Sequence, residues 1–428
     1  MKDATQSKPI VTTLSNGLRV VCDPMPGIES VAVGVWVAAG AMDERETENG
    51  VAHLLEHMAF KGTTSRTARQ IVEEMENIGG HANAATSYPH TGYYARLLKG
   101  DIACAVDILA DILTNPLFEE DALATEKDVV IQEFGEAQDT PDDVLFEQIQ
   151  LLTYAGQPLG RPILGDSASV RRQTPQSLRA FMARTYRADQ TVICASGGVD
   201  QAALLQLVER KFADFGTPPA GGSATRALTR HTSGAFHDER DLEQTHIAFA
   251  APGGALRDED YFAWRLFGEM LGGGMSSRLF QTVRETLGLA YSVYAYTDAY
   301  DDIGTTGVYL GVDADDAGKA LETSYREIRS MASGVSHEEL DRARALVLSS
   351  YVMSLESPAV RAERAAAQLF SFGRLAPSDE IKQRLQAVGV DDIAACAQRF
   401  LASDNHSLAV VGPADFDTLT AIVADKGA

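Results

Sequence analysis

The sequence predicts an α+β protein made of two homologous halves, each a mainly antiparallel sheet covered by helices. The chain has 428 residues, more than one ordinary hydrophobic core requires. Alternating strand patterns and longer helical patterns are mixed along it. Their order repeats after residues 216–235, which are rich in Gly, Pro, Ser and Thr and typical of a linker. We therefore expect one half at 1–215 and the other at 236–428.

The first half carries clear local signals. Asn16-Gly17 between two β-rich runs predicts an initial hairpin, and valines alternating from Val31 to Val37 predict a half-buried strand. Thr174 followed by Pro175 is typical of a helix N-terminus. The expected elements are strands at 9–14, 18–23 and 30–39, helices at 50–60 and 67–79, strands at 81–88 and 91–98, helices up to about 153 and at 175–186, a strand at 191–199 and a helix at 200–213.

Two matching motifs indicate that the second half is a divergent copy of the first. Thr91-Gly92-Tyr93-Tyr94 matches Thr306-Gly307-Val308-Tyr309. His57-Met58 falls against Glu269-Met270 at nearly the same offset. Two similar offsets in the same order suggest an internal duplication.

The composition is that of a globular protein. A net charge of −23 would repel nucleic acid and is compatible with cationic peptides. No apolar stretch is long enough to cross a bilayer, and the N-terminus resembles neither a signal peptide nor a mitochondrial presequence. These features predict a cytoplasmic protein, from a bacterium, with reduced cysteines. The eleven acids between 119 and 147 are either a solvated helix surface or a hint of basic substrates.

A histidine pair in HLLEHMAFKGT predicts a metal site. On a helix, His53 and His57 lie one turn apart on one face, with Glu56 beside them. Two imidazoles can bind Zn²⁺, and a neighbouring carboxylate can take a proton from an activated water molecule. The alternative is that both histidines are satisfied by hydrogen bonds within the fold. The residues at the corresponding positions of the second copy are Arg265, Gly268 and Glu269, so the second copy has lost the triplet.

The stretch GVAHLLEHMAFKGT resembles the zinc helix of the pitrilysin-type inverted zinc peptidases, or inverzincins, in the branch that contains the mitochondrial processing peptidase. In that branch, the third ligand is a glutamate 76 residues beyond the second histidine, which is Glu133 here. The resemblance implies one zinc ion per chain, held by His53, His57 and Glu133. It also implies Glu56 as the general base, with one coordination position open for water.

The same branch has a supporting glutamate seven residues before the third ligand, and Glu126 stands there. The resemblance implies that Glu126 orients a histidine ligand through its other ring nitrogen or holds the hydrogen bonds of the site. The alternative is one more acid on a solvated helix.

The stretch GGHANAATSYPHTGYY resembles the substrate-binding edge strand of the family, where an extended peptide adds to a sheet. The implied contacts are Asn83 and the backbone of Ala84 and Ala85. The alternative is an ordinary sheet strand with Asn83 as a turn residue.

The segment from Arg284 to Tyr291 resembles the family's R-x-x-x-x-x-x-Y motif. The arginine would anchor a substrate carbonyl, and the tyrosine would stabilise an oxyanion. The alternative is a surface arginine on a helix and a partly buried strand tyrosine.

Together, these resemblances imply a zinc endopeptidase that cleaves short or unfolded peptides, with a preference for basic ones suggested by the net charge. In relatives of this length, two chains close like a clamshell around a chamber, and the Arg–Tyr pair reaches the partner's zinc. Because this chain has both sets of residues, a homodimer is expected, with a heterodimer as the alternative. The rival function is a non-catalytic structural subunit, as in the core proteins of a respiratory complex.

Overall fold

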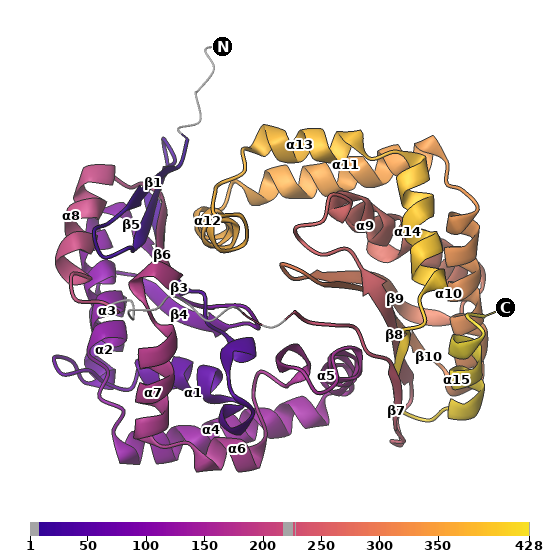
Figure 1. Cartoon of the computed structure of the whole chain (residues 1–428), viewed down its shortest axis with the longest axis horizontal. Coiled ribbons are helices and arrows are strands. Elements are labelled where there is room, and N and C mark those ends of the chain that lie inside the picture. The colour runs from indigo at the N-terminus through magenta and orange to yellow at the C-terminus, as the bar shows by residue number, and fades with distance from the viewer. Residues whose placement is uncertain (1–7, 217–225, 227, 428) are drawn as a thin grey trace. The chain divides into compact units, whose positions relative to one another are not determined.

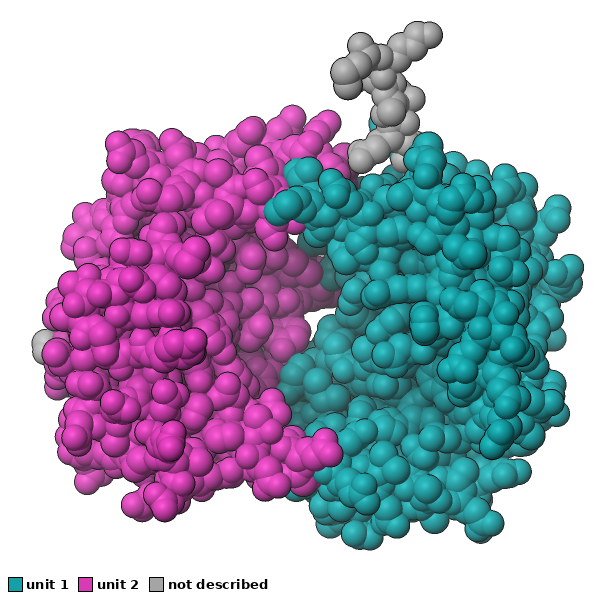
Figure 2. Space-filling model, turned by 180° about the vertical axis from the view of Figure 1, so that it is seen from behind, with its two compact units in different colours: residues 1–134, 161–226, 352–375 teal, residues 135–160, 227–351, 376–428 magenta. Residues whose placement is uncertain are grey.

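The computed structural model describes residues 8–216, 226 and 228–427, which form two compact units (Figure 1, Figure 2). Unit 1 consists of Met1–Phe134, Arg161–Arg226 and Val352–Leu375, and unit 2 of Gly135–Gly160, Ala227–Tyr351 and Ala376–Ala428. Each unit has its own sheet, helices and hydrophobic core, so the expected α+β class is confirmed. No helix in these ranges combines the length and apolar character that crossing a membrane requires.

The helices and strands of the first half follow the order expected from the sequence. The bounds of all the described strands and of the principal helices, in both halves, are as follows. The strands are β1 (Ile10–Thr13), β2 (Arg19–Pro24), β3 (Ser30–Val37), β4 (His81–Thr86), β5 (Thr91–Leu98), β6 (Thr191–Gly197), β7 (Gly234–Asp238), β8 (Thr245–Gly253), β9 (Ala290–Ala299), β10 (Gly304–Val312) and β11 (Ser407–Val411). The helices are α1 (Val51–Ala59), α2 (Ala68–Asn77), α3 (Ile102–Thr114), α4 (Glu120–Asp139), α5 (Pro141–Thr153), α6 (Ser167–Arg172), α7 (Pro175–Thr185), α8 (Gln201–Lys211), α9 (Tyr261–Gly268), α10 (Ala317–Ala332), α11 (His337–Ser354), α12 (Pro358–Phe372), α13 (Ser378–Ala387), α14 (Val390–Ala402), α15 (Phe416–Ala424) and the π-helical segments η6 (Glu269–Gly273) and η7 (Phe280–Thr286).

Apart from β1, which has no counterpart among the described strands of sheet 2, the two sheets share one topology. Sheet 1, in unit 1, has the order β1-β2-β6-β3-β5-β4, and sheet 2, in unit 2, has the order β7-β11-β8-β10-β9. In sheet 1 only the β2/β6 pair is parallel, and in sheet 2 only the β7/β11 pair is parallel. Strands β7 to β9 therefore repeat β2 to β4 in position and direction, which confirms the two homologous halves.

The compact units exchange one helix each relative to the sequence halves 1–215 and 236–428. Helix α5, from the first half of the sequence, packs on strands β7, β8 and β11 of sheet 2. Helix α12, from the second half, packs on β2, β3 and β6 of sheet 1. Of the expected linker at 216–235, residues 217–225 and 227 lie outside the described residues, and β7 begins at Gly234, within the expected range.

Strand β3 differs from the half-buried strand that its valines predict. Its residues after Ser30 are all buried, so both faces are covered. Val33 belongs to the main core of unit 1, whereas Trp36 on the other face packs in a second cluster with Ala362 and Ala366 of α12. The prediction was wrong because the covering helix lies more than 300 residues away in the sequence, beyond the reach of a local pattern.

Candidate metal site

Helix α1 presents three polar side chains together because its other positions are buried. The buried residues of α1 are Val51, Ala52, Leu54, Leu55, Met58 and Ala59. His53, Glu56 and His57 are each partly exposed on the remaining face. The helix expected at 50–60 therefore exists, and it carries the polar triplet on one side.

The N-terminus of α1 is held by Glu44, which no sequence pattern indicated. Gly50 precedes the helix with a left-handed φ of 86° and has no side chain to cap it. Glu44 takes this role by accepting hydrogen bonds from Gly50 N (3.0 Å) and Ala52 N (2.8 Å). Asn49 Nδ2 donates a third (3.0 Å). Burial raises the pKa of Glu44 to about 7, although these hydrogen bonds favour its charged form.

Glu133, from α4, completes a group of three converging side chains. Its Oε2 lies 3.7 Å from His53 Nε2 and 3.6 Å from His57 Nε2. One potential ligand atom from each residue lies within 4.8 Å of the other two. Within the part of the chain that the structure describes, this is the one group of three or more His, Cys, Asp or Glu residues with such spacing.

The two histidines are close enough to affect each other. Their ring centroids are 4.6 Å apart. Burial, reinforced by the neighbouring His57, lowers the pKa of His53 to about 4. His53 is therefore neutral at physiological pH, as a metal ligand must be.

Glu56 is fixed by the end of strand β4. Thr86 Oγ1 donates a hydrogen bond to Glu56 Oε2 at 2.5 Å. Burial raises the pKa of Glu56 above its ordinary value, and the hydrogen bonds from Thr86 and the proximity of His57 offset part of this shift. The raised pKa makes Glu56 a stronger base than an exposed carboxylate.

Glu126 contacts the triplet from two helical turns before Glu133. It is 5% exposed, and its Oε2 lies 3.3 Å from His57 Nδ1. Its Oε1 lies 2.7 Å from Lys61 Nζ. The alternative of a solvated surface acid is therefore wrong.

Neither Lys61 nor Thr86 was singled out from the sequence, although Lys61 lies in the same conspicuous HLLEHMAFKGT stretch.

Strand β4 lies at the edge of sheet 1. It pairs with β5 on one side, and no described strand lies on its other side. Asn83 and Ala85 are exposed, whereas Ala84 is buried. Asn83 lies within β4 and pairs with Tyr94 of β5, so it is not a turn residue. Its Oδ1 accepts a hydrogen bond from Ala84 N (2.9 Å).

Arg284 and Tyr291 lie side by side in unit 2. Arg284 belongs to η7 and Tyr291 to β9. The guanidinium carbon of Arg284 is 5.0 Å from the centre of the Tyr291 ring, a cation–π contact. Tyr291 is 74% exposed, not partly buried as the alternative interpretation expected.

The second copy keeps the architecture of the site without its ligands. Arg265 lies in α9, and Glu269 begins η6. Arg265 Nη1 lies 3.4 Å from Thr297 Oγ1 in β9. Thr297 pairs with Thr306, as Thr86 pairs with Thr91, so Thr297 is the topological counterpart of the threonine that holds Glu56.

Comparisons with known proteins agree with this architecture. The model of a family described as insulinase (peptidase family M16) matches residues 19–167, and a model described as the peptidase M16 inactive domain matches residues 172–347. An uncharacterized zinc protease of Rickettsia felis is 37% identical over 95% of this chain and 98% of its own length. An uncharacterized zinc protease of Bacillus subtilis is 35% identical over 94% of this chain and 97% of its own length.

Two solved structures share the fold. The crystal structure of a protease from Helicobacter pylori has a TM-score of 0.88 at 20% identity, covering 95% of this chain and 99% of that chain. The structure of a peptidase M16 inactive domain from Pseudomonas fluorescens has a TM-score of 0.87 at 22% identity, covering 95% and 98%. At these identities the likeness concerns the fold alone.

Proposed function

Because the chain belongs to peptidase family M16, we propose that it is a zinc-dependent endopeptidase with one metal ion per chain, held by His53, His57 and Glu133. The convergence of two histidine Nε2 atoms on Glu133 Oε2, at 3.7 and 3.6 Å, carries the proposal. Ligand atoms about 2.0–2.1 Å from a tetrahedral zinc ion lie roughly 3.4 Å apart, so the donor set and its spacing fit this ion. Three protein ligands also leave a fourth position for water or substrate, as catalytic zinc requires.

His53, His57 and Glu133 would hold a zinc ion, which when bound would supply Lewis acidity to a scissile carbonyl and would lower the pKa of a water molecule to roughly 7. Glu56 then transfers the proton. Thr86 fixes Glu56 Oε2, so we assign to Oε1 the proton that is taken from the attacking water and given to the leaving amine. Glu126 holds His57 in the orientation that directs Nε2 towards the ligand group.

The open edge of β4 is the proposed peptide-binding site. An extended peptide would add to this edge through main-chain hydrogen bonds around Asn83, Ala84 and Ala85. Thr86 ends the same strand and bonds to Glu56, so a peptide on this edge would lead to the catalytic carboxylate. Strand addition requires an extended backbone, which favours short or unfolded substrates. The net charge of −23 favours basic ones.

Arg284 and Tyr291 are proposed to complete the site as hydrogen-bond donors. Their cation–π contact keeps the two donors together, so that one binds a substrate carbonyl and the other stabilises the oxyanion of the tetrahedral intermediate. We propose that they act on the zinc site of a partner chain within a homodimeric chamber. A heterodimer with a homologous subunit is the alternative arrangement.

The purified chain tests the proposal directly. Elemental analysis should find one zinc per chain, and quenched fluorescent peptides should be cleaved, basic ones faster than acidic ones of equal length. Raising the salt concentration should reduce the preference for basic peptides because it screens long-range attraction. If zinc-replete protein cleaves neither peptide, the proposal of endopeptidase activity is refuted. The alternative function, a non-catalytic structural subunit, is then favoured.

Mixed dimers test whether the site is shared. Tyr291→Phe should lower kcat by about 10²–10³-fold, as removal of an oxyanion donor does. Mixing Tyr291→Phe chains with Glu56→Gln chains should then restore about a quarter of the wild-type activity, since half of the dimers are mixed and each mixed dimer has one intact site. Homodimers of either variant, prepared in parallel, are the controls. An absence of rescue in verified mixed dimers would place the whole site within one chain.

A further inference from the structure

A chain of contacts leads from the candidate metal site to Lys61. Glu126 faces His57 Nδ1 with one oxygen (3.3 Å) and Lys61 Nζ with the other (2.7 Å). A buried carboxylate needs a compensating cation, because burial disfavours the charged form. Lys61 supplies that cation at hydrogen-bond distance. It therefore helps to determine the direction in which Glu126 faces the histidine.

The charged form of Glu126 selects the tautomer of His57. A carboxylate accepts hydrogen bonds and does not donate them, so the His57 proton must lie on Nδ1. Nε2 then keeps its lone pair and faces Glu133 Oε2 at 3.6 Å. Since a metal ligand needs this lone pair, the contact with Glu126 favours the metal-binding form of His57.

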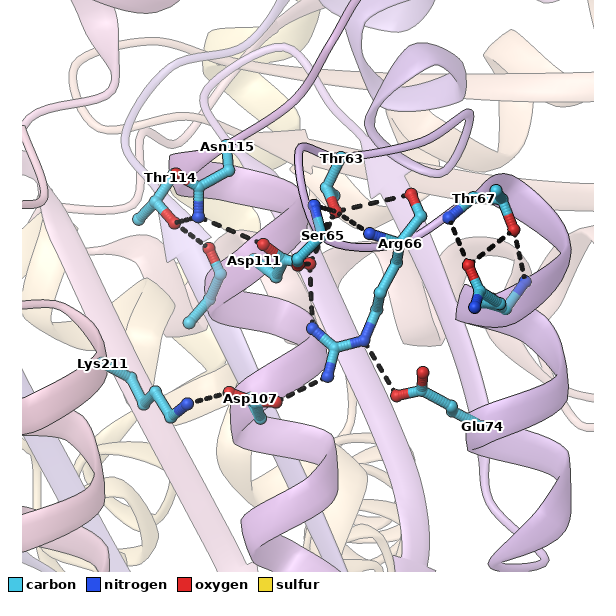
Figure 3. A network of polar contacts seen from close by, with 12 residues as sticks. Thr63, Ser65, Arg66, Thr67, Glu74, Asp107, Asp111, Thr114, Asn115 and Lys211 are labelled. Atoms are coloured by element: carbon cyan, nitrogen blue, oxygen red, sulfur yellow. Dashed lines mark hydrogen bonds and ion pairs between the residues drawn. The ribbon is translucent and has the colours of Figure 1, made fainter.

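The segment that follows Lys61 is anchored to α3 through Thr63, Ser65 and Arg66 (Figure 3). Asp111, a buried residue of α3, accepts three hydrogen bonds from this segment on Oδ2. The donors are Thr63 Oγ1 and Ser65 Oγ, each at 2.6 Å, and Arg66 Nη1 at 2.8 Å. Burial alone would raise the pKa of Asp111, but these hydrogen bonds lower it, so the anchor stays ionised.

The same network borders a surface pocket of about 360 Å³, but its cations are already paired. Arg66 also donates to Glu74 (2.8 Å) and Asp107 (2.6 Å), and Lys211 pairs with Asp107 (Figure 3). Because Arg66 and Lys211 both face carboxylates, neither is left to bind an anion. The network instead fixes the segment from Thr63 to Arg66 to α3. Lys61 is therefore fixed on one side by α1 and on the other by this anchored segment.

We propose that Lys61 is a positioning residue of the metal site, acting through Glu126 on the tautomer and orientation of His57. The inference rests on the proposed function, because it concerns zinc binding. Lys61→Met keeps an unbranched side chain and removes the cation, which leaves the Glu126 carboxylate buried without it. Glu126 then loses the contact that fixes its direction, so His57 is no longer held in the binding form.

The test compares zinc affinities, measured by competition with a chromophoric chelator at one fixed pH. Lys61→Met should weaken zinc binding by about 10–100-fold, the range typical of losing a group that supports a metal ligand. Lys61→Arg keeps the charge and should restore most of the affinity. Lys99→Met is the matched control, because Lys99 also pairs with a carboxylate of unit 1, Glu29 (2.8 Å), but lies outside both the contact with Glu126 and the anchored segment. It should bind zinc as the wild type does.

The melting temperature of each metal-free chain separates loss of the fold from loss of the site. If Lys61→Met does not fold, Lys61→Gln takes its place in the same comparison. Wild-type affinity in the neutral Lys61 variant would overturn the inference and leave the proposed function standing. An equal loss in Lys99→Met would also overturn it, since the effect would then follow from general charge. A wild-type chain that binds no zinc would overturn the proposed function and this inference together.

Discussion

Replacing Glu56 with glutamine will lower kcat for peptide cleavage by about 10²–10⁴-fold, the contribution that a general acid–base group typically makes. The amide has nearly the shape of the carboxylate and can still contact Thr86. It cannot take a proton from the attacking water, so the loss should appear in kcat more than in KM. The measurement is steady-state cleavage of a quenched peptide by zinc-loaded protein.

Zinc content is the essential control for Glu56→Gln, because Glu56 is not assigned as a ligand. The variant should retain one zinc per chain. Glu136→Gln, which neutralises an exposed acid on the same helix as Glu133, should leave both zinc content and kcat unchanged. Full activity in Glu56→Gln would mean that another group transfers the proton.

Removing zinc with a chelator will abolish cleavage and lower the melting temperature of the protein. A ligand that binds only the folded state stabilises it by about 4 kcal/mol when its free concentration is about a thousandfold above Kd. The site should show this linkage because its ligands come from two helices, α1 and α4, which unfolding would separate. Calorimetry with and without chelator, followed by zinc addition, measures both the loss and its reversal.

Glu133→Gln provides the matched comparison for chelation. An amide oxygen is a weaker zinc ligand than a carboxylate, so this variant should bind zinc poorly and melt at nearly the same temperature with and without chelator. The metal-free wild type and the metal-free variant should then resemble each other. A chelator shift of wild-type size in Glu133→Gln would contradict the assignment of Glu133 as a ligand.

Those parts of the site that lie on one helix could be predicted from the sequence. The spacing of His53, Glu56 and His57 requires only the helical repeat, and the structure places all three on one face of α1. Glu133 could not be found in this way, because it lies on another helix. The resemblance to a known family was needed to connect it with the histidines.

The residues that support this site escaped prediction because their roles depend on tertiary contacts. Glu44 caps α1 from a preceding turn, and Thr86 reaches Glu56 from the end of a strand. Lys61 meets Glu126 only after α4 has packed beside α1. No periodicity relates these pairs, so a sequence pattern gives them the same weight as ordinary surface residues.

The exchange of α5 and α12 determines when each sheet can be completed during synthesis. The face of sheet 1 that carries Trp36 is closed by α12, which ends at Phe372. Sheet 1 is therefore left with an uncovered apolar face until most of the chain has emerged from the ribosome. Because each sheet takes one covering helix from the other half of the sequence, we expect neither half to complete its core by itself.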